Sequence, residues 1–121
     1  MPKKILIVDD EPDILVALQF LMEQQDYNVR TADSGEFALD LIYQFKPDLV
    51  LLDIMLPGID GWEVCEIVRL NLDYQNTRII FLTAKDREVD IAKGLALGGD
   101  AYITKPFKNV ELIAKVKELL D

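Results

Sequence analysis

The chain has 121 residues, close to the commonest size of one domain, and half of them are hydrophobic, which is enough for a single continuous core. Acidic residues outnumber basic ones 22 to 13, and the resulting net charge of -9 excludes a domain that binds nucleic acid directly, because such binding needs clustered Lys and Arg. The single cysteine, Cys65, excludes an internal disulfide. The sequence shows no signal peptide and no apolar run of bilayer length. We therefore expect one cytoplasmic domain over residues 1–121, without membrane association.

Apolar runs of strand length alternate along the chain with longer segments of helical period, a pattern typical of repeated βαβ units. The predicted strands are Ile5–Val8, Asn28–Ala32, the run from Leu49 that ends at Asp53, Ile79–Leu82 and Ala101–Ile103. The predicted helices run from Pro12 to about Gln25, from Gly35 to Phe45, from about Trp62 to Asn71, from a cap at Asp86 to Leu97, and from about Asn109 to the end.

Local signals mark where these helices begin or end. Pro12 suits a first helical turn, while Ser34 and Asp86 are the residue types that cap helix N-termini. The second helix should end at Lys46-Pro47, because a residue before proline is pushed out of the helical region. Gly98-Gly99 provides a C-terminal stop for the fourth helix.

The third predicted strand indicates the fold class. Val50, Leu51 and Leu52 leave it no polar face, so we expect it to be buried on both sides, as strands of parallel sheets are. With right-handed crossovers, the helices then cover both faces of the sheet. The sequence therefore predicts an α/β, doubly wound, five-stranded parallel sheet, in which ligands bind outside the carboxyl ends of the strands.

Four of the five predicted strands end in residues suited to a metal and a phosphoryl group. These strand ends carry Asp9-Asp10, Asp53, Thr83 and Lys105. Each alone would more often be a solvated loop residue, but parallel strands bring all four ends to one edge. Three carboxylates gathered there repel one another unless one is partly protonated or a divalent cation is bound. Oxygen ligands of this kind favour Mg²⁺, with Mn²⁺ as the other candidate.

The remaining polar groups at this edge match the needs of phosphoryl transfer. Lys105 supplies one mobile positive charge and Thr83 one hydroxyl donor. The transition state of phosphoryl transfer requires mainly positioning and neutralisation of oxygens. The nucleophile would be a carboxylate, and Asp53 lies at the centre of the predicted sheet.

Two other functions could use the same fold. A flavin or nucleotide carrier needs a phosphate-binding turn after the first strand, where Asp9-Asp10 would repel the phosphate. A metal-dependent hydrolase with an aspartyl nucleophile is a closer competitor. Such enzymes usually carry a second acid two residues after the nucleophile, and that position is Met55 here.

The motifs Ile5-Leu-Ile-Val-Asp-Asp-Glu-Pro12, Asp53-x-x-x-Pro-Gly-x-Asp-Gly61, Leu82-Thr-Ala84 and Lys105-Pro-Phe107 together resemble the response regulator receiver domain. The resemblance covers essentially the entire chain and implies a flavodoxin-like (βα)5 fold with strand order 2-1-3-4-5. It implies a signalling switch of two-component systems that promotes its own phosphorylation and dephosphorylation, and not a conventional enzyme. A degenerate receiver that acts as a constitutive binding module is disfavoured, because every expected phosphorylation residue is present.

The resemblance also assigns roles to the residues at the strand ends. Asp53 would accept a phosphoryl group from a phosphohistidine on a sensor histidine kinase or a histidine phosphotransfer protein. Asp10, Asp53 and the backbone carbonyl of Met55 would bind Mg²⁺ directly, and Asp9 would act mostly through water. Lys105 would pair with a phosphoryl oxygen, and its bond to Pro106 is expected to be cis.

Switching, by the same resemblance, involves Thr83 and Tyr102. Thr83 would swing toward the phosphoryl group and Tyr102 would follow inward, which would change the surface of the fourth helix, fifth strand and fifth helix. A downstream protein or output domain would dock there, and a homodimer through this surface follows by analogy. From pattern alone, a half-buried Tyr102 with its hydroxyl in water is an equal alternative.

Further residues carry weaker expectations. The first helix is apolar nearly all round, and we expect its surplus residues Leu15, Val16 and Phe20 to help dock the phosphodonor. Met55 and Lys85 occupy positions that modulate phosphoryl lifetime in the family, and neither suits a water-orienting role, which predicts slow self-dephosphorylation. The remaining prominent residues are expected to be structural: Trp62 as a cap on the core, Cys65 as a small buried hydrophobe, and Asp33 and Asp60 as loop residues.

Overall fold

The computed structural model describes residues 1–121, and its five parallel strands form one sheet in the order β2-β1-β3-β4-β5. The strands are β1 (Lys4–Val8), β2 (Asn28–Ala32), β3 (Leu49–Leu52), β4 (Arg78–Thr83) and β5 (Ala101–Thr104). The helices are α1 (Pro12–Glu23), α2 (Gly35–Phe45), α3 (Gly61–Leu70), α4 (Glu88–Ala96) and α5 (Asn109–Leu120), with a short 3-10 helix, η1 (Leu72–Tyr74), after α3. The predicted α/β doubly wound, flavodoxin-like fold and its strand order are confirmed.

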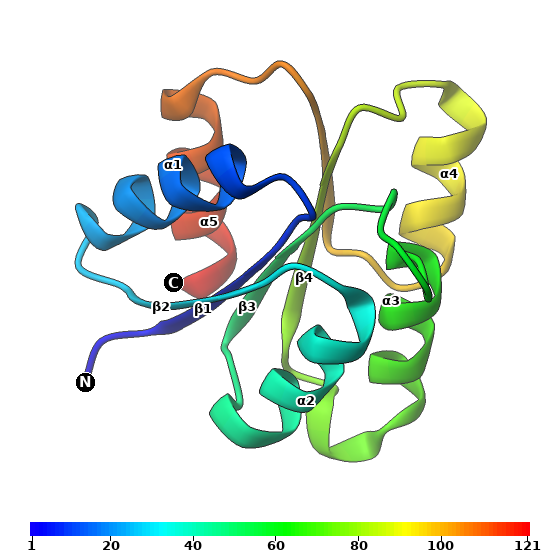
Figure 1. Ribbon diagram of the computed structural model, residues 1–121, viewed down its shortest axis with the longest axis horizontal. Helices are drawn as coiled ribbons and strands as arrows, with labels where there is room; N and C mark the ends of the chain where they lie inside the picture. The colour runs from blue at the N-terminus through cyan, green and yellow to red at the C-terminus, as the bar shows by residue number, and fades with distance from the viewer.

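Helices cover both faces of this sheet (Figure 1). α1 and α5 pack on one face, where Leu18 and Leu112 form an apolar core with the strands. α2 and α3 pack on the other face around a second core that includes Ala38 and Val64. α4 lies on this second face beside α3 (Figure 1). No helix combines the length and the apolar character that crossing a membrane requires.

The central strand β3 is apolar on both sides because it lies between the two cores. All four of its residues are buried, and it pairs with β1 on one side and β4 on the other. The chain leaves β1 toward β2 and returns across the sheet to β3, so strand order reverses between β1 and β3. The carboxyl ends of these two strands therefore flank the topological switch point, where this class of fold binds ligands.

Several predicted helix ends agree with the structure in their physical detail. Ser34 caps α2, since its Oγ accepts a hydrogen bond of 3.1 Å from the backbone N–H of Phe37. Lys46 leaves the helical region for a left-handed conformation (φ 53°), which ends α2 just before Pro47. Asp60 lies in the loop, as expected, and caps α3 by accepting from the N–H of Glu63 at 2.9 Å.

Other predicted boundaries are wrong. Asp86 does not cap α4, because the cap position falls on Arg87, whose guanidinium donates instead to Asp90 in the first turn at 3.2 Å. α1 ends at Glu23 and not near Gln25, and the chain then turns through a left-handed Asp26 (φ 66°). We did not predict η1 from the sequence, because a segment of three residues is too short to show a helical period.

Candidate functional site

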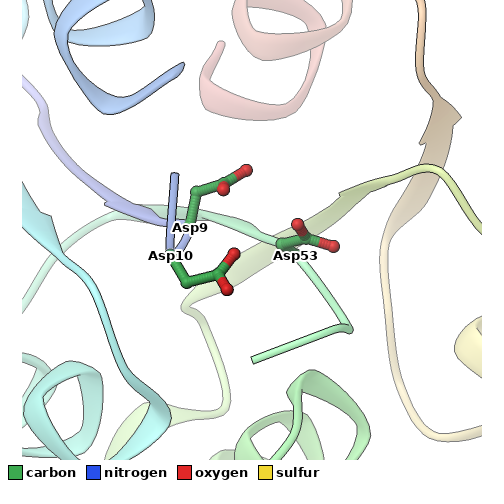
Figure 2. Close-up of side chains that lie close together, drawn as sticks. All are labelled: Asp9, Asp10 and Asp53. Atoms are coloured by element: carbon green, nitrogen blue, oxygen red, sulfur yellow. The ribbon is translucent and has the colours of Figure 1, made fainter. Parts of the chain in front are cut away.

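Three carboxylates gather at the carboxyl ends of β1 and β3. Asp9 and Asp10 follow β1 and Asp53 follows β3, and one oxygen of each lies within 4.8 Å of the others (Figure 2). Asp9 and Asp53 are buried, with only 2% and 3% of their surfaces exposed, whereas Asp10 is exposed. The three acids that the sequence placed together by topology therefore do meet, and Asp10 faces the solvent side.

Lys105 reaches this acidic cluster from the end of β5. Its Nζ donates hydrogen bonds to Oδ2 of Asp9 at 2.6 Å and to Oδ2 of Asp53 at 3.2 Å. The peptide bond between Lys105 and Pro106 is cis, as the resemblance implied. One ammonium group thus bridges the two buried carboxylates, although its residue lies far from both in the sequence.

Backbone N–H groups bind the second oxygen of each buried carboxylate. Oδ1 of Asp53 accepts from Ile54 at 2.7 Å and from Met55 at 3.3 Å. Oδ1 of Asp9 accepts from Glu11 at 2.9 Å. Each carboxylate therefore has one oxygen oriented by its own loop and one turned toward Lys105, which fixes the direction in which both acids point.

Burial and charge act against each other in this cluster. Burial raises the pKa of Asp9, although the hydrogen bonds from Lys105 and from the Glu11 N–H partly offset the effect. Burial alone would lower the pKa of Lys105, but its hydrogen bond to Asp9 and the charge of Asp53 together raise it. The pKa of Lys105 therefore lies above its usual value, which favours the charged ammonium form beside the two buried acids.

Thr83 and Tyr102 meet at the backbone of one loop residue, Lys85. Thr83, at the end of β4, is fully buried, and its Oγ1 accepts a long hydrogen bond of 3.4 Å from the Lys85 N–H. The hydroxyl of Tyr102 donates to the Lys85 carbonyl at 2.7 Å. Burial raises the pKa of Tyr102 to about 12. Tyr102 is half-buried, as the alternative expected, but its hydroxyl is hydrogen-bonded to the Lys85 carbonyl.

Gly61 belongs to the motif that begins at Asp53, but its structural role was not predicted from the sequence. A Cβ at Gly61 would overlap the carbonyl oxygen of Asp53 and lie 2.7 Å from the Cα of Ile54. The Gly61 N–H donates to the Ile54 carbonyl at 2.9 Å, which closes the loop beneath Asp53. The Asp60-Gly61 pair signalled a turn, but nothing local signals a close approach to a segment several residues earlier.

Trp62, Cys65 and Asp33, which we expected to be structural, lie outside the acidic cluster. The ring of Trp62 lies 5.5 Å from that of Phe81, and the Lys93 ammonium lies 4.9 Å from the Trp62 ring centre, so Trp62 covers the core beside α4. Cys65 is fully buried, and burial raises the pKa of its thiol to about 11. Asp33 is exposed and lies outside the acidic cluster.

The fold and the cluster define a class: doubly wound α/β domains with an acidic pocket at the topological switch point. Within this class, the family model of the response regulator receiver domain matches residues 5–117. The chain therefore belongs to the receiver-domain family of two-component response regulators. Receiver domains are signalling switches and not conventional enzymes, and they bind Mg²⁺ at an acidic pocket and interact with histidine kinases and output domains.

Solved structures agree with this assignment. The chain is 38% identical to a protein from Chloroflexus aurantiacus assigned as a response regulator, with 99% of this chain and 98% of that one covered and a TM-score of 0.94. It is 34% identical to a CheY-like receiver domain protein from Methanospirillum hungatei, with 100% and 95% covered and a TM-score of 0.93. The BeF3-activated receiver domain of Klebsiella pneumoniae RstA is 33% identical, with 98% of each chain covered and a TM-score of 0.91.

Proposed function

We propose that residues 1–121 form one receiver domain in which Asp53 accepts a phosphoryl group from a phosphohistidine, in a reaction that depends on Mg²⁺. The donor would be a sensor histidine kinase or a histidine phosphotransfer protein. The observation that carries this proposal is the position of Asp53, which is buried beside Asp9 and Asp10 and bridged by Lys105 at 3.2 Å. Nucleophile, acidic ligands and cation thus lie within a few ångströms of one another.

The charges and ligands of the cluster fit one divalent cation. Three carboxylates face a single ammonium group, which leaves two negative charges unbalanced. All available ligand atoms are oxygens, which Mg²⁺ prefers, and Mn²⁺ accepts the same set. Asp10, Asp53 and the Met55 carbonyl would bind the ion directly, with Asp9 acting through water. When bound, it would neutralise charge that develops on the phosphoryl oxygens.

The transfer itself needs little from the protein beyond position. An oxygen of Asp53 forms a bond to phosphorus as the bond from phosphorus to the histidine nitrogen breaks, and the released imidazole takes up a proton. Lys105 already contacts Oδ2 of Asp53, so its ammonium can move to a phosphoryl oxygen without a large displacement. The N–H groups of Ile54 and Met55 meanwhile keep the carboxylate oriented.

The contacts at Lys85 support a switch through Thr83 and Tyr102. In our proposal, the Thr83 hydroxyl turns to a phosphoryl oxygen, and the loop at Lys85 shifts with it. Tyr102 donates to the Lys85 carbonyl, so movement of this loop moves the tyrosine as well. The surface of α4, β5 and α5, which exposes Val89 and Val110, would then bind a downstream protein or output domain, or a second copy of the chain.

The phosphodonor would dock next to the site, against α1. A cavity of about 320 Å³ lies between α1 and the loop after β5, and Ile14, Lys105 and Phe107 are among the residues that line it. Val16 and Phe20 of α1 are 69% and 63% exposed, as a docking surface requires. Leu15, which we expected to join them, is half-buried and packs against the core on that face.

Intact-mass measurement tests the proposed phosphorylation. The protein is incubated with Mg²⁺ and a small-molecule phosphodonor, as wild type, as Asp53→Asn and as Asp60→Asn. Asp60 is the matched control because it lies outside the acidic cluster and asparagine caps a helix as well as aspartate does. We expect the mass of one phosphoryl group on wild type and Asp60→Asn only, and none without Mg²⁺. An adduct on Asp53→Asn would contradict the proposal.

A further inference from the structure

The face of α2 and α3 contains a trough that the phosphorylation site does not use. Three hollows adjoin one another there: a central one of about 170 Å³, one of about 420 Å³ beside the C-terminal end of α2, called the lower hollow, and one of about 230 Å³ along α3, called the upper hollow. The central and lower hollows share Tyr43 and Tyr74, and the central and upper ones share Ile67. We call this continuous surface, from Glu63 on α3 to Thr77, the α2–α3 trough.

The centre of the trough is apolar and its edges are strongly exposed. Six of the seven residues that line the central hollow are hydrophobic, among them Leu39 and Ile67. Tyr43 of α2, which lines the central and lower hollows, is 72% exposed, and Leu70 of α3, which lines the upper hollow, is 81% exposed. Figure 1 shows α2 and α3 side by side on the sheet face opposite α1 and α5, away from the expected donor surface. Contiguous apolar exposure of this kind marks a site of interaction.

Acidic side chains stand at both ends of the trough. Glu63 and Glu66 line the upper hollow, and Asp73 lines the lower one. No ion pair of the protein involves any of these three residues. The lower hollow also contains Lys46, but Asp48 lies beside it, so both ends of the trough remain acidic overall.

We propose that the α2–α3 trough binds a helical segment of a partner protein that presents two or three large apolar side chains between basic residues at its two ends. An amphipathic helix in a groove uses anchors at i, i+3, i+4 and i+7, which suits an apolar centre. Lys or Arg at the ends of that helix would meet the unpaired acids, which adds specificity and speeds encounter. Binding here requires no phosphorylation, so it is independent of the function proposed for Asp53.

A titration with a synthetic peptide tests the proposal without Mg²⁺ or a phosphodonor. The probe is an amphipathic helical peptide with Leu at i, i+3, i+4 and i+7 and Lys at both ends, and its twin carries Glu in place of every Lys. The isotope-labelled full chain is followed by NMR as wild type, as Leu70→Gln and as Val110→Gln. Val110 is the matched control because it is 79% exposed but lies on α5, outside the trough.

We expect amide shifts on α2 and α3, and a dissociation constant for the Lys peptide at least about fivefold lower than for the Glu twin. Leu70→Gln should weaken binding about fivefold through lost apolar burial, and Val110→Gln less than about twofold. Spectra outside the substituted region report that each variant is folded. No binding, equal affinity for both peptides, or shifts confined to other helices would overturn the proposal. A wild-type dimer in sedimentation that Leu70→Gln alone dissociates would do so too, because the occupant would then be a second copy.

Discussion

Arg69 of α3 forms an ion pair with Asp100 and also hydrogen-bonds two backbone carbonyls. Its replacement tests how much these contacts stabilise the connection between α4 and β5. Its guanidinium donates to the Gly98 carbonyl at 2.9 Å, to the Tyr74 carbonyl at 3.3 Å and to Oδ2 of Asp100 at 2.9 Å. Both side chains of the ion pair are mostly buried, at 18% and 21% exposure. The end of α3 is thereby tied to the distant loop between α4 and β5 and to the adjacent η1.

Replacement of Arg69 by Met keeps most of the apolar stem and removes all three hydrogen bonds. Hydrogen bonds to charged groups contribute about 1.5–3 kcal/mol each when partly buried, and they are not additive, so we expect Arg69→Met to lower the free energy of unfolding by about 2–4 kcal/mol. Arg78→Met is the matched control. Arg78 pairs with the same Asp100, but at 3.4 Å and with 49% of its side chain exposed, so its loss should cost at most about 0.5 kcal/mol.

Urea unfolding followed by the fluorescence of Trp62, the only tryptophan, and by circular dichroism measures both changes. The same measurement in high salt shows how far each ion pair is screened by solvent ions. The exposed Arg78 pair should lose its small contribution to the free energy of unfolding, whereas the hydrogen bonds of Arg69 should keep most of theirs. If Arg78→Met destabilises the protein as much as Arg69→Met, the reasoning from burial and hydrogen-bond geometry is refuted.

Three further predictions concern single positions. The pKa of the Cys65 thiol is about 11 in the native state and about 9 in the unfolded chain, so the unfolded chain loses this proton first. The free energy of unfolding should therefore fall as pH rises from 9 toward 11. Cys65→Ala should remove this part of the pH dependence, as urea unfolding at several pH values would show. Gly94→Ala would place a Cβ 2.9 Å from the Tyr102 ring and 3.0 Å from that of Phe81. The cost of this overpacking should exceed the helix-propensity gain of about 1 kcal/mol. Urea unfolding should therefore show a free energy of unfolding that is lower by about 1 kcal/mol. The side chain of Met55 is 49% exposed and cannot orient the attacking water, so the phosphorylated protein should lose its phosphoryl group slowly. Met55→Gln should lose it faster, as intact mass measured over time would show. A wild-type phosphorylated form that lasts only seconds would contradict this prediction.

The edge of the sheet that carries the acidic cluster could be predicted from strand direction, and the family resemblance supplied the strand order that makes β1 and β3 neighbours. Once β1 and β3 are recognised as buried parallel neighbours, the residues after Val8 and Leu52 must lie at one edge of the sheet. Strand direction and strand order together place Asp9 beside Asp53. Strand direction also puts Lys105 at this edge, but β5 lies at the far side of the sheet from β1, so direction alone does not predict the contact between Lys105 and Asp9.

What sequence reasoning missed depends on contacts between segments whose approach no local pattern encodes. Gly61 is required by the Asp53 carbonyl beneath it, and Arg69 bonds the carbonyl of Gly98 in the loop after α4 and that of Tyr74 in η1. Asp86 is a good cap by residue type, yet the cap position falls on Arg87, whose guanidinium bonds Asp90 in the first turn. The α2–α3 trough likewise exists only because two helices pack at a particular distance and leave Tyr43 and Leu70 uncovered.

The two hydrogen bonds at Lys85 differ in a way that bears on the proposed switch. The contact from the Lys85 N–H to Thr83 is 3.4 Å long and weak, whereas the contact from Tyr102 to the Lys85 carbonyl is 2.7 Å and short. Thr83 can therefore leave its present partner for a phosphoryl oxygen at little cost. Tyr102 fixes the loop, so any displacement of Lys85 must either carry the tyrosine along or break the stronger bond. The tyrosine ring packs against Phe81, which in turn contacts Trp62. Movement at Lys85 would thus reach α3 as well as α4.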